Sequence, residues 1–276
     1  MARAGRGFTY LEILIALAVV VVVIGLLVPA VMKLRAAAER ARCANHLKQL
    51  GAAALAYHDV RGHFPAGGSP TPDLSAVTPD CRAAAGWSWA YLLLPHLGLE
   101  QVYRDPDPRG VHHTPVPVFL CAARRTADPG GLAKIDYAAN GSSDPFGPTG
   151  AFAQTGTPEL RLGDVRGGTA GLVLFAGKRL NRAALGASLD DDDAYATVGW
   201  GPDFEVHRTA AEPPAPDVNE PGVLAPRSGF GSAHVGVFCA GFADGSVRPL
   251  RYTIDPALWQ RACHRSGAPE PPSPNS

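Results

Sequence analysis

An uninterrupted apolar run near the N-terminus constrains this chain more than any other feature. Residues 13–32 read ILIALAVVVVVIGLLVPAVM, about 20 residues without a charge, which is enough for a helix to cross a lipid bilayer. A secretory signal peptide would have a shorter apolar core followed by a small-residue cleavage region. Here a helical pattern continues instead through residues 33–59. The run therefore predicts a membrane-spanning helix, and a plain signal anchor is the simplest form of it.

The residues just before the apolar run are more specific. The segment Arg6-Gly7-Phe8-Thr9-Tyr10-Leu11-Glu12 resembles the type III signal of type IV prepilins, in which a basic residue and Gly precede a Phe-Thr-(x)-Leu-Glu sequence. In that family a membrane aspartyl peptidase cuts after the Gly and methylates the new N-terminal Phe. The resemblance implies cleavage between Gly7 and Phe8, methylation of Phe8, and prepilin peptidase as a partner.

Glu12 places a carboxylate at the start of the apolar helix. An ionisable group inside a membrane is costly and usually has a named partner. The prepilin resemblance implies that Glu12 pairs with the N-terminal amine of a neighbouring pilin-like subunit and sets the stagger during assembly. The alternative is that Glu12 lies in the cytoplasmic headgroup region, where its cost is small.

Flanking charges and one proline add detail to the membrane helix. Arg3 and Arg6 favour a cytoplasmic N-terminus, whereas the basic residues of segment 33–42 weaken that inference. The prepilin resemblance decides the orientation: a single pass through the inner membrane, with the head domain periplasmic or exposed at the cell surface after assembly. Pro29 removes one backbone hydrogen bond and is expected to kink the helix.

Beyond the membrane the helix carries an apolar stripe for a globular domain. Leu47, Leu50, Ala54 and Tyr57 recur at spacings of three and four. Most of the 31 glycines and 26 prolines follow, which predicts short strands and long loops. We expect an α+β, pilin-like fold in which the long helix packs on an antiparallel sheet. The predicted parts are a leader (1–7), a transmembrane and assembly helix (8–32), the soluble half of the spine helix (33–60), a head domain (61–265) and a disordered tail (266–276).

The head domain resembles a narrower group, the large N-methylated prepilin-like proteins of uncharacterised function that end in a His-x9-Asp-Gly motif. Here that motif is His234, Asp244 and Gly245. His46 replaces the usual Asn of the group, and the strand ending at Gly177 lacks the usual Glu. The other matching segments, in chain order, are Cys43 to Gly51, Tyr57 to Asp59, His63 to Pro65, Trp89 to Leu97, Phe119 to Cys121, Asp136 to Gly141 and Phe230 to His234.

Two apolar runs bounded by Gly, 172–176 and 235–243, are typical of buried strands. Asp244-Gly245 follows the second run and predicts a hairpin turn. His234 and Asp244 would then stand at opposite ends of one strand, too far apart to form a catalytic pair within the hairpin.

The five cysteines form no C-x-x-C pair, so neither a zinc ribbon nor a thioredoxin-type site is predicted. One or two disulfides and a leftover thiol are expected in an oxidising compartment, and the spacing alone leaves their pairing open. Cys43 and Cys121, both within segments that match the family, are the candidate disulfide pair.

Other candidate chemistry is weak. Ser232, His234 and Asp244 suggest a hydrolase, but no G-x-S-x-G nucleophile elbow is present. The histidines at 112, 113 and 207 have no partners at metal-ligand spacing. The aspartates 190–193 lack the alternate spacing of a calcium loop and indicate an exposed acidic segment. We therefore expect no enzyme activity, no metal and no cofactor.

The whole pattern predicts a structural subunit or accessory component of a type IV pilus or a type II secretion pseudopilus. Lys+Arg and Asp+Glu balance at 25 each, which argues against a nucleic-acid partner. The Pro-rich stretch 208–227 is expected to be a surface loop. The rival interpretation is a membrane-anchored binding module that does not polymerise, with loops 60–90 and 180–225 as its ligand site.

Overall fold

The computed structural model describes residues 9–69, 86–105, 107–125, 132–141, 149–185, 195, 200, 206–223 and 228–267. The chain divides into two compact units, 1–39 and 40–276. In the order of the chain, the α-helices and strands are α1 (Tyr10–Arg61), α2 (Trp89–Leu92), α3 (Glu100–Tyr103), α4 (Pro108–His113), β1 (Tyr137–Asn140), β2 (Val173–Gly177), β3 (His207–Arg208), β4 (Ala215–Pro216), β5 (Gly231–Ser232), β6 (Val237–Phe242), β7 (Val247–Arg251) and α5 (Pro256–Cys263).

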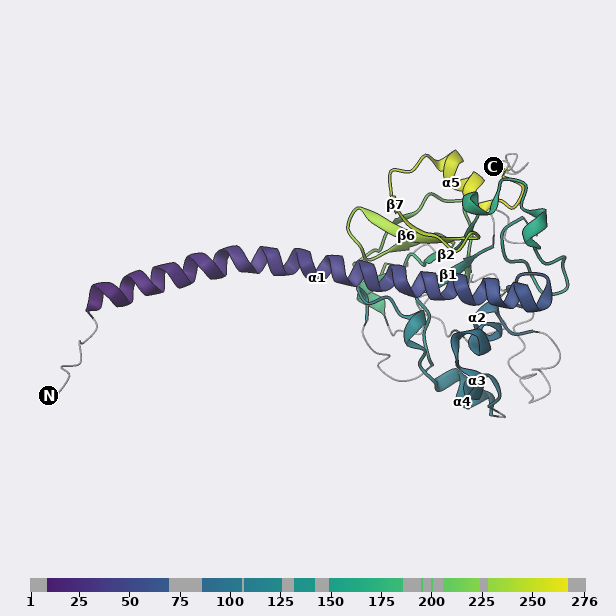
Figure 1. The fold of residues 1–276 in the computed structure, drawn as a ribbon, viewed down its shortest axis with the longest axis horizontal. Helices are drawn as coiled ribbons and strands as arrows, with labels where there is room; N and C mark the ends of the chain where they lie inside the picture. Colours follow the sequence, from purple (N-terminus) through teal and green to yellow (C-terminus); the bar gives the residue numbers. More distant parts are fainter. Residues whose placement is uncertain are drawn as a thin grey trace. The chain divides into compact units, whose positions relative to one another are not determined.

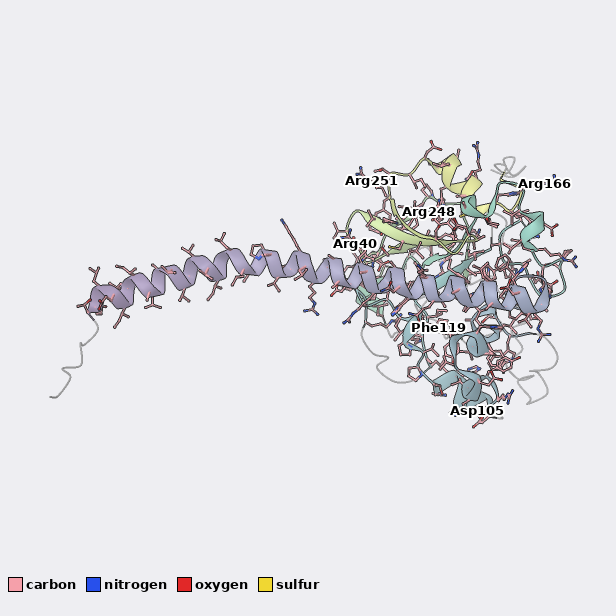
Figure 2. All side chains as sticks on the ribbon, in the orientation of Figure 1. Arg40, Asp105, Phe119, Arg166, Arg248 and Arg251 are labelled. Carbon is pink, nitrogen blue, oxygen red and sulfur yellow. The ribbon has the colours of Figure 1, made fainter. Side chains whose placement is uncertain are left out.

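In the first unit, the beginning of α1 is apolar on every side. None of the large apolar side chains between Leu11 and Leu34 is less than 46 % exposed, and they project outward around the whole helix (Figure 2). By length and composition, α1 is the one helix among the described residues that could cross a membrane. The predicted membrane-spanning helix is confirmed in this sense, and α1 continues through Pro29.

In the second unit, the same helix has a buried stripe. Leu47, Leu50 and Ala54 are at most 1 % exposed, as their helical spacing predicts. They pack in one core with α2, the loop before β1 and one face of the sheet. Figure 1 shows this part of α1 with α2, α3 and α4 on one side and β6, β7 and α5 on the other.

The main sheet has the strand order β3-β1-β2-β6-β7. The pairs β1–β2, β2–β6 and β6–β7 are antiparallel, but β1 and β3 pair in parallel. The sheet is therefore mixed: the predicted antiparallel pairing is confirmed for three of the four strand pairs, and the pair at this edge is parallel instead. A parallel neighbour needs a long crossover, which the chain between residues 141 and 206 supplies.

Alternation along the strands separates two cores. In β6, Phe238, Ala240 and Phe242 face α5, whose Trp259 is fully buried there, while Cys239 faces α1. A register shift in β2 lets Leu174 and Phe175 both join the α1 side. The sheet is thus covered by α1 on one face and by α5 on the other.

The predicted hairpin is confirmed. Strands β6 and β7 pair from Val237 with Arg251 to Gly241 with Val247, and Gly245 takes a left-handed φ of 78° in the turn. Asp244 accepts a hydrogen bond from the backbone N–H of Ser246 at 2.9 Å and pairs with Arg248 at 3.1 Å. Asp244 and Gly245 therefore shape the turn.

The prediction of a surface loop over residues 208–227 is wrong in part. His207 and Arg208 form the edge strand β3 and are at most 1 % exposed, and residues 215–216 pair with β5. The prolines correctly indicated an irregular backbone. A strand of only two residues, however, has no apolar run from which it could be predicted.

The buried stripe of α1 generates a stability prediction. We expect Leu50→Ala to lower the free energy of unfolding by about 2–5 kcal/mol, because it removes a fully buried side chain. Leu258→Ala is the control, since Leu258 is 53 % exposed, and it should change stability by about 0.5 kcal/mol or less. Denaturant unfolding of the full chain in detergent measures both, and equal losses would contradict the assignment of α1 to the core.

Candidate functional site

The start of α1 forms a helix cap. The carboxylate of Glu12 accepts hydrogen bonds from the backbone N–H of Thr9 at 2.8 Å and from its hydroxyl at 2.9 Å. The backbone N–H of Glu12 donates to the Thr9 hydroxyl oxygen at 3.4 Å. This reciprocal pattern is the capping box, which the Thr-x-x-Glu spacing could have revealed. Gly7 and Phe8 lie outside the described residues.

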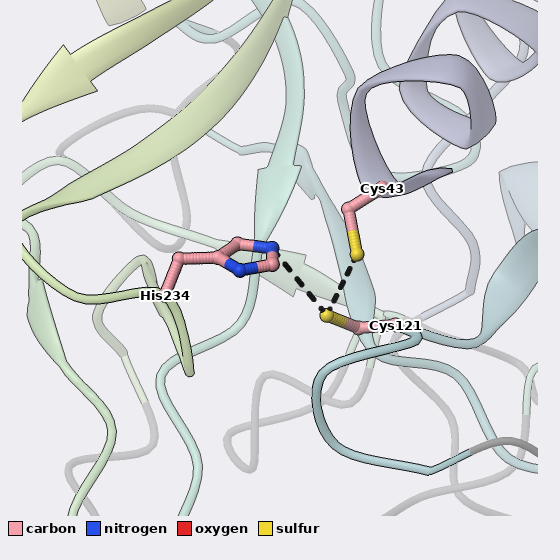
Figure 3. Close-up of side chains that lie close together, drawn as sticks. All are labelled: Cys43, Cys121 and His234. Carbon is pink, nitrogen blue, oxygen red and sulfur yellow. Dashed lines mark hydrogen bonds between the residues drawn. The ribbon is translucent and has the colours of Figure 1, made fainter. Parts of the chain in front are cut away.

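A second site lies in the head domain, where two sulfurs and an imidazole meet. Cys43 Sγ and Cys121 Sγ are 2.9 Å apart, and Cys121 Sγ lies 4.0 Å from His234 Nε2. The three side chains point toward one another (Figure 3). Cys43 and Cys121 are 2 % exposed and His234 is 7 % exposed. This cluster, called the Cys–His site below, combines residues that are 78 and 113 positions apart in the chain.

Each member of the Cys–His site comes from a different element. Cys43 projects from α1, Cys121 follows the short helix Pro117–Phe119, and His234 stands between β5 and β6. The backbone N–H of Cys121 donates to Asp136 Oδ2 at 2.7 Å, and that of His234 donates to Ser232 Oγ at 3.2 Å. Backbone hydrogen bonds therefore hold both loops in place.

The helix is fastened to the Cys121 loop at a second point. His46 Nδ1 lies 3.0 Å from the carbonyl oxygen of Leu120. The contact joins α1 to the backbone of the loop that carries Cys121.

The two thiols differ in acidity. The hydrogen bond from Cys121 lowers the pKa of the Cys43 thiol to about 4, against the opposing effect of burial, and His234 adds to the lowering. The same hydrogen bond and burial raise the pKa of the Cys121 thiol. Cys43 is therefore the more acidic sulfur of the pair.

Four charged side chains form a buried network next to the Cys–His site. Arg124 donates two hydrogen bonds to the carboxylate of Asp217, both 2.8 Å long, and Arg125 donates to Asp136 at 2.6 Å. Arg124 Nη1 also donates to the backbone carbonyl of Asp136 at 3.0 Å. The side chains of Arg124, Asp136 and Asp217 are at most 2 % exposed. Sequence analysis did not single out this network, because arginines and aspartates so far apart carry no local signal.

The structure does not bring Ser232, His234 and Asp244 together as a hydrolase would require. Ser232 Oγ donates to the carbonyl of Val237 at 3.2 Å and lies 2.9 Å from the hydroxyl of Tyr252, so it serves the turn before β6. His234 faces Cys121, and Asp244 is a turn residue at the other end of β6. The predicted separation of His234 and Asp244 is confirmed.

Several predicted residues stay untested. The aspartates 190–193 and Cys81 lie outside the described residues. The described cysteines, Cys43, Cys121, Cys239 and Cys263, are free thiols in the structure, and the Cys43–Cys121 disulfide stays a prediction. His207 is buried and stacks on Trp200, with ring centroids 4.1 Å apart.

The buried arginine–aspartate network generates a second prediction. Asp217→Ala should destabilise the chain by about 3–5 kcal/mol, because it leaves the guanidinium of Arg124 buried without its bidentate partner. Glu100→Ala removes the exposed pair with Arg104 and should cost about 1 kcal/mol or less. Thermal unfolding of both variants measures the difference, and equal costs would show that the network is not a structural support.

Comparison with known proteins adds a family. The model of the family described as "Protein of unknown function (DUF1559)" matches residues 32–257, which include the Cys–His site and the β6–β7 turn. No curated protein and no solved structure matches the chain. Because the family model covers most of the chain, this protein belongs to the DUF1559 family of proteins of unknown function.

Proposed function

We propose that the protein is a type IV pilin-like subunit, a structural or accessory component of a pilus or of a type II secretion pseudopilus. In this proposal prepilin peptidase cuts after Gly7 and methylates Phe8. The mature chain then stands in the inner membrane with its head domain outside the cytoplasm, and pilin-like subunits associate through residues 8–32.

The observation that carries the proposal is the change of environment along α1. Its first part exposes apolar side chains on every side, which is unfavourable in water and suits lipid or a bundle of similar helices. Its second part has only a narrow buried stripe and is an integral part of the head. One uninterrupted helix, Tyr10–Arg61, combines both properties, as a pilin spine must.

The cap at Thr9 and Glu12 is compatible with assembly. Thr9 donates both of these hydrogen bonds to Oε2 of Glu12, and within the described part of the chain no hydrogen bond reaches Oε1. A carboxylate has about four acceptor positions. Glu12 can therefore cap its own helix and still accept a hydrogen bond from the amine of a neighbouring subunit.

Processing gives the first test. Intact-mass and N-terminal peptide mass spectrometry of the protein from its native membrane should detect a chain that begins at Phe8 and carries one added methyl group. A Gly7→Leu variant is expected to remain unprocessed. A wild-type chain that still begins at Met1 or Ala2, in cells with active prepilin peptidase, would contradict the proposal and favour the membrane-anchored binding module.

Assembly gives the second test. Glu12→Ala should still insert in the membrane but lose at least about tenfold of its incorporation into sheared or cross-linked assemblies, because the partner of the neighbouring amine is missing. Glu39→Ala is the control, since Glu39 is the other acidic residue of α1 before the head and pairs with Arg35, at 3.1 Å. If quantitative immunoblotting finds Glu12→Ala incorporated as well as the wild type, the assembly role of Glu12 is contradicted.

A further inference from the structure

A small pocket at the Cys–His site is lined by a third sulfur. Cys239, on the α1 face of β6, lines it together with Cys43, Cys121 and His234. The space open to the centre of a water molecule is about 10 Å³, room for one water or one ion. We propose that Cys43, Cys121 and His234 bind one zinc ion here, with Cys239 as the fourth ligand.

The donor set selects the metal. Thiolate and imidazole are the usual zinc ligands, and three cysteines with one histidine is a common structural zinc set with four-coordinate, tetrahedral geometry. Calcium and magnesium prefer oxygen donors, which the three clustered ligand groups do not supply. Sequence analysis missed this set because its members come from four separate elements, without the short spacings that identify zinc motifs.

The distances among three of the four proposed ligands are close to those of a zinc site. The ligand atoms of Cys43, Cys121 and His234 all lie within 4.8 Å of one another. Two sulfurs on a tetrahedral zinc, each about 2.3 Å from the metal, are about 3.8 Å apart. The sulfurs of Cys43 and Cys121 are 2.9 Å apart. Metal binding therefore requires them to separate by about 0.9 Å.

Charge favours a divalent cation at this position. The arginines and aspartates of the buried network, Arg124 and Arg125 with Asp136 and Asp217, balance each other two against two. Buried thiolates are costly unless a cation neutralises their charge. Each thiol that binds zinc releases one proton, and the ion neutralises two of the resulting thiolates.

A zinc ion would join α1 to the Cys121 loop, to the loop before β6 and to β6 itself. A Cys43–Cys121 disulfide would use two of the same sulfurs and so exclude zinc. It would not involve His234 or Cys239. The zinc proposal is independent of the pilin-like function, because an unprocessed or unassembled chain can still hold the metal.

The test is direct metal analysis of the full chain. Protein purified in detergent with a non-metal affinity tag should contain about one zinc per chain by elemental mass spectrometry. Replacement of zinc by Co²⁺ should produce the intense visible bands of a tetrahedral site and a sulfur-to-cobalt charge-transfer band in the near ultraviolet. Competition with a chromophoric chelator then gives the zinc affinity of each variant.

Variants locate the metal. Cys43→Ala and His234→Gln should weaken zinc binding more than about 100-fold, since even changes around zinc ligands cost 10–100-fold. Cys263→Ala should bind zinc as the wild type does, because Cys263 is a fully buried thiol of the α5 core, outside the pocket. Circular dichroism confirms that each variant is folded.

Three outcomes would overturn the proposal. The first is folded wild-type protein, with its thiols reduced, that takes up neither zinc nor Co²⁺. The second is undiminished zinc binding by both Cys43→Ala and His234→Gln. The third is a Cys43–Cys121 disulfide in the isolated protein whose reduction restores no metal binding. Metal uptake by the wild-type protein tests the zinc proposal even if a variant fails to fold.

Discussion

Burial of one helical stripe against a sheet is the contact on which the head domain depends. Leu47, Leu50 and Ala54 of α1 are almost fully buried, and the core that contains them also contains residues of α2, β1, β2 and β6. A five-stranded sheet with such short strands presents little surface of its own. The helix supplies the apolar partner for one face, and α5 supplies the partner for the other.

The same contact organises the Cys–His site. Because α1 lies on the sheet, Cys43 comes next to the loop that carries Cys121, while the turn before β6 brings His234 to the same point. The buried pair of Arg124 and Asp217 and the hydrogen bond from Cys121 to Asp136 hold that loop. A ligand or bond at this junction would therefore stabilise the packing of α1 in the head.

Local patterns predicted a large part of this fold. The helix, its buried stripe, the strands near 172–176 and 235–243 and the Asp244-Gly245 turn all follow from spacing, apolar runs and turn residues that act over a few positions. The parallel edge strand His207–Arg208 did not follow. It consists of two polar residues that are buried beside β1, where His207 also stacks on Trp200, and no local pattern in the sequence indicates such neighbours.

The sequence by itself determined that this chain has an apolar helix able to span a membrane, that the helix continues into an α+β head, and that a hairpin closes the sheet. These features depend on residue types at short, regular spacings. Only the tertiary structure decided that Cys43, Cys121 and His234 meet and that Arg124 pairs with Asp217. Contacts across about 80–110 residues depend on how the elements pack, because packing, and not spacing, brings distant side chains within bonding distance.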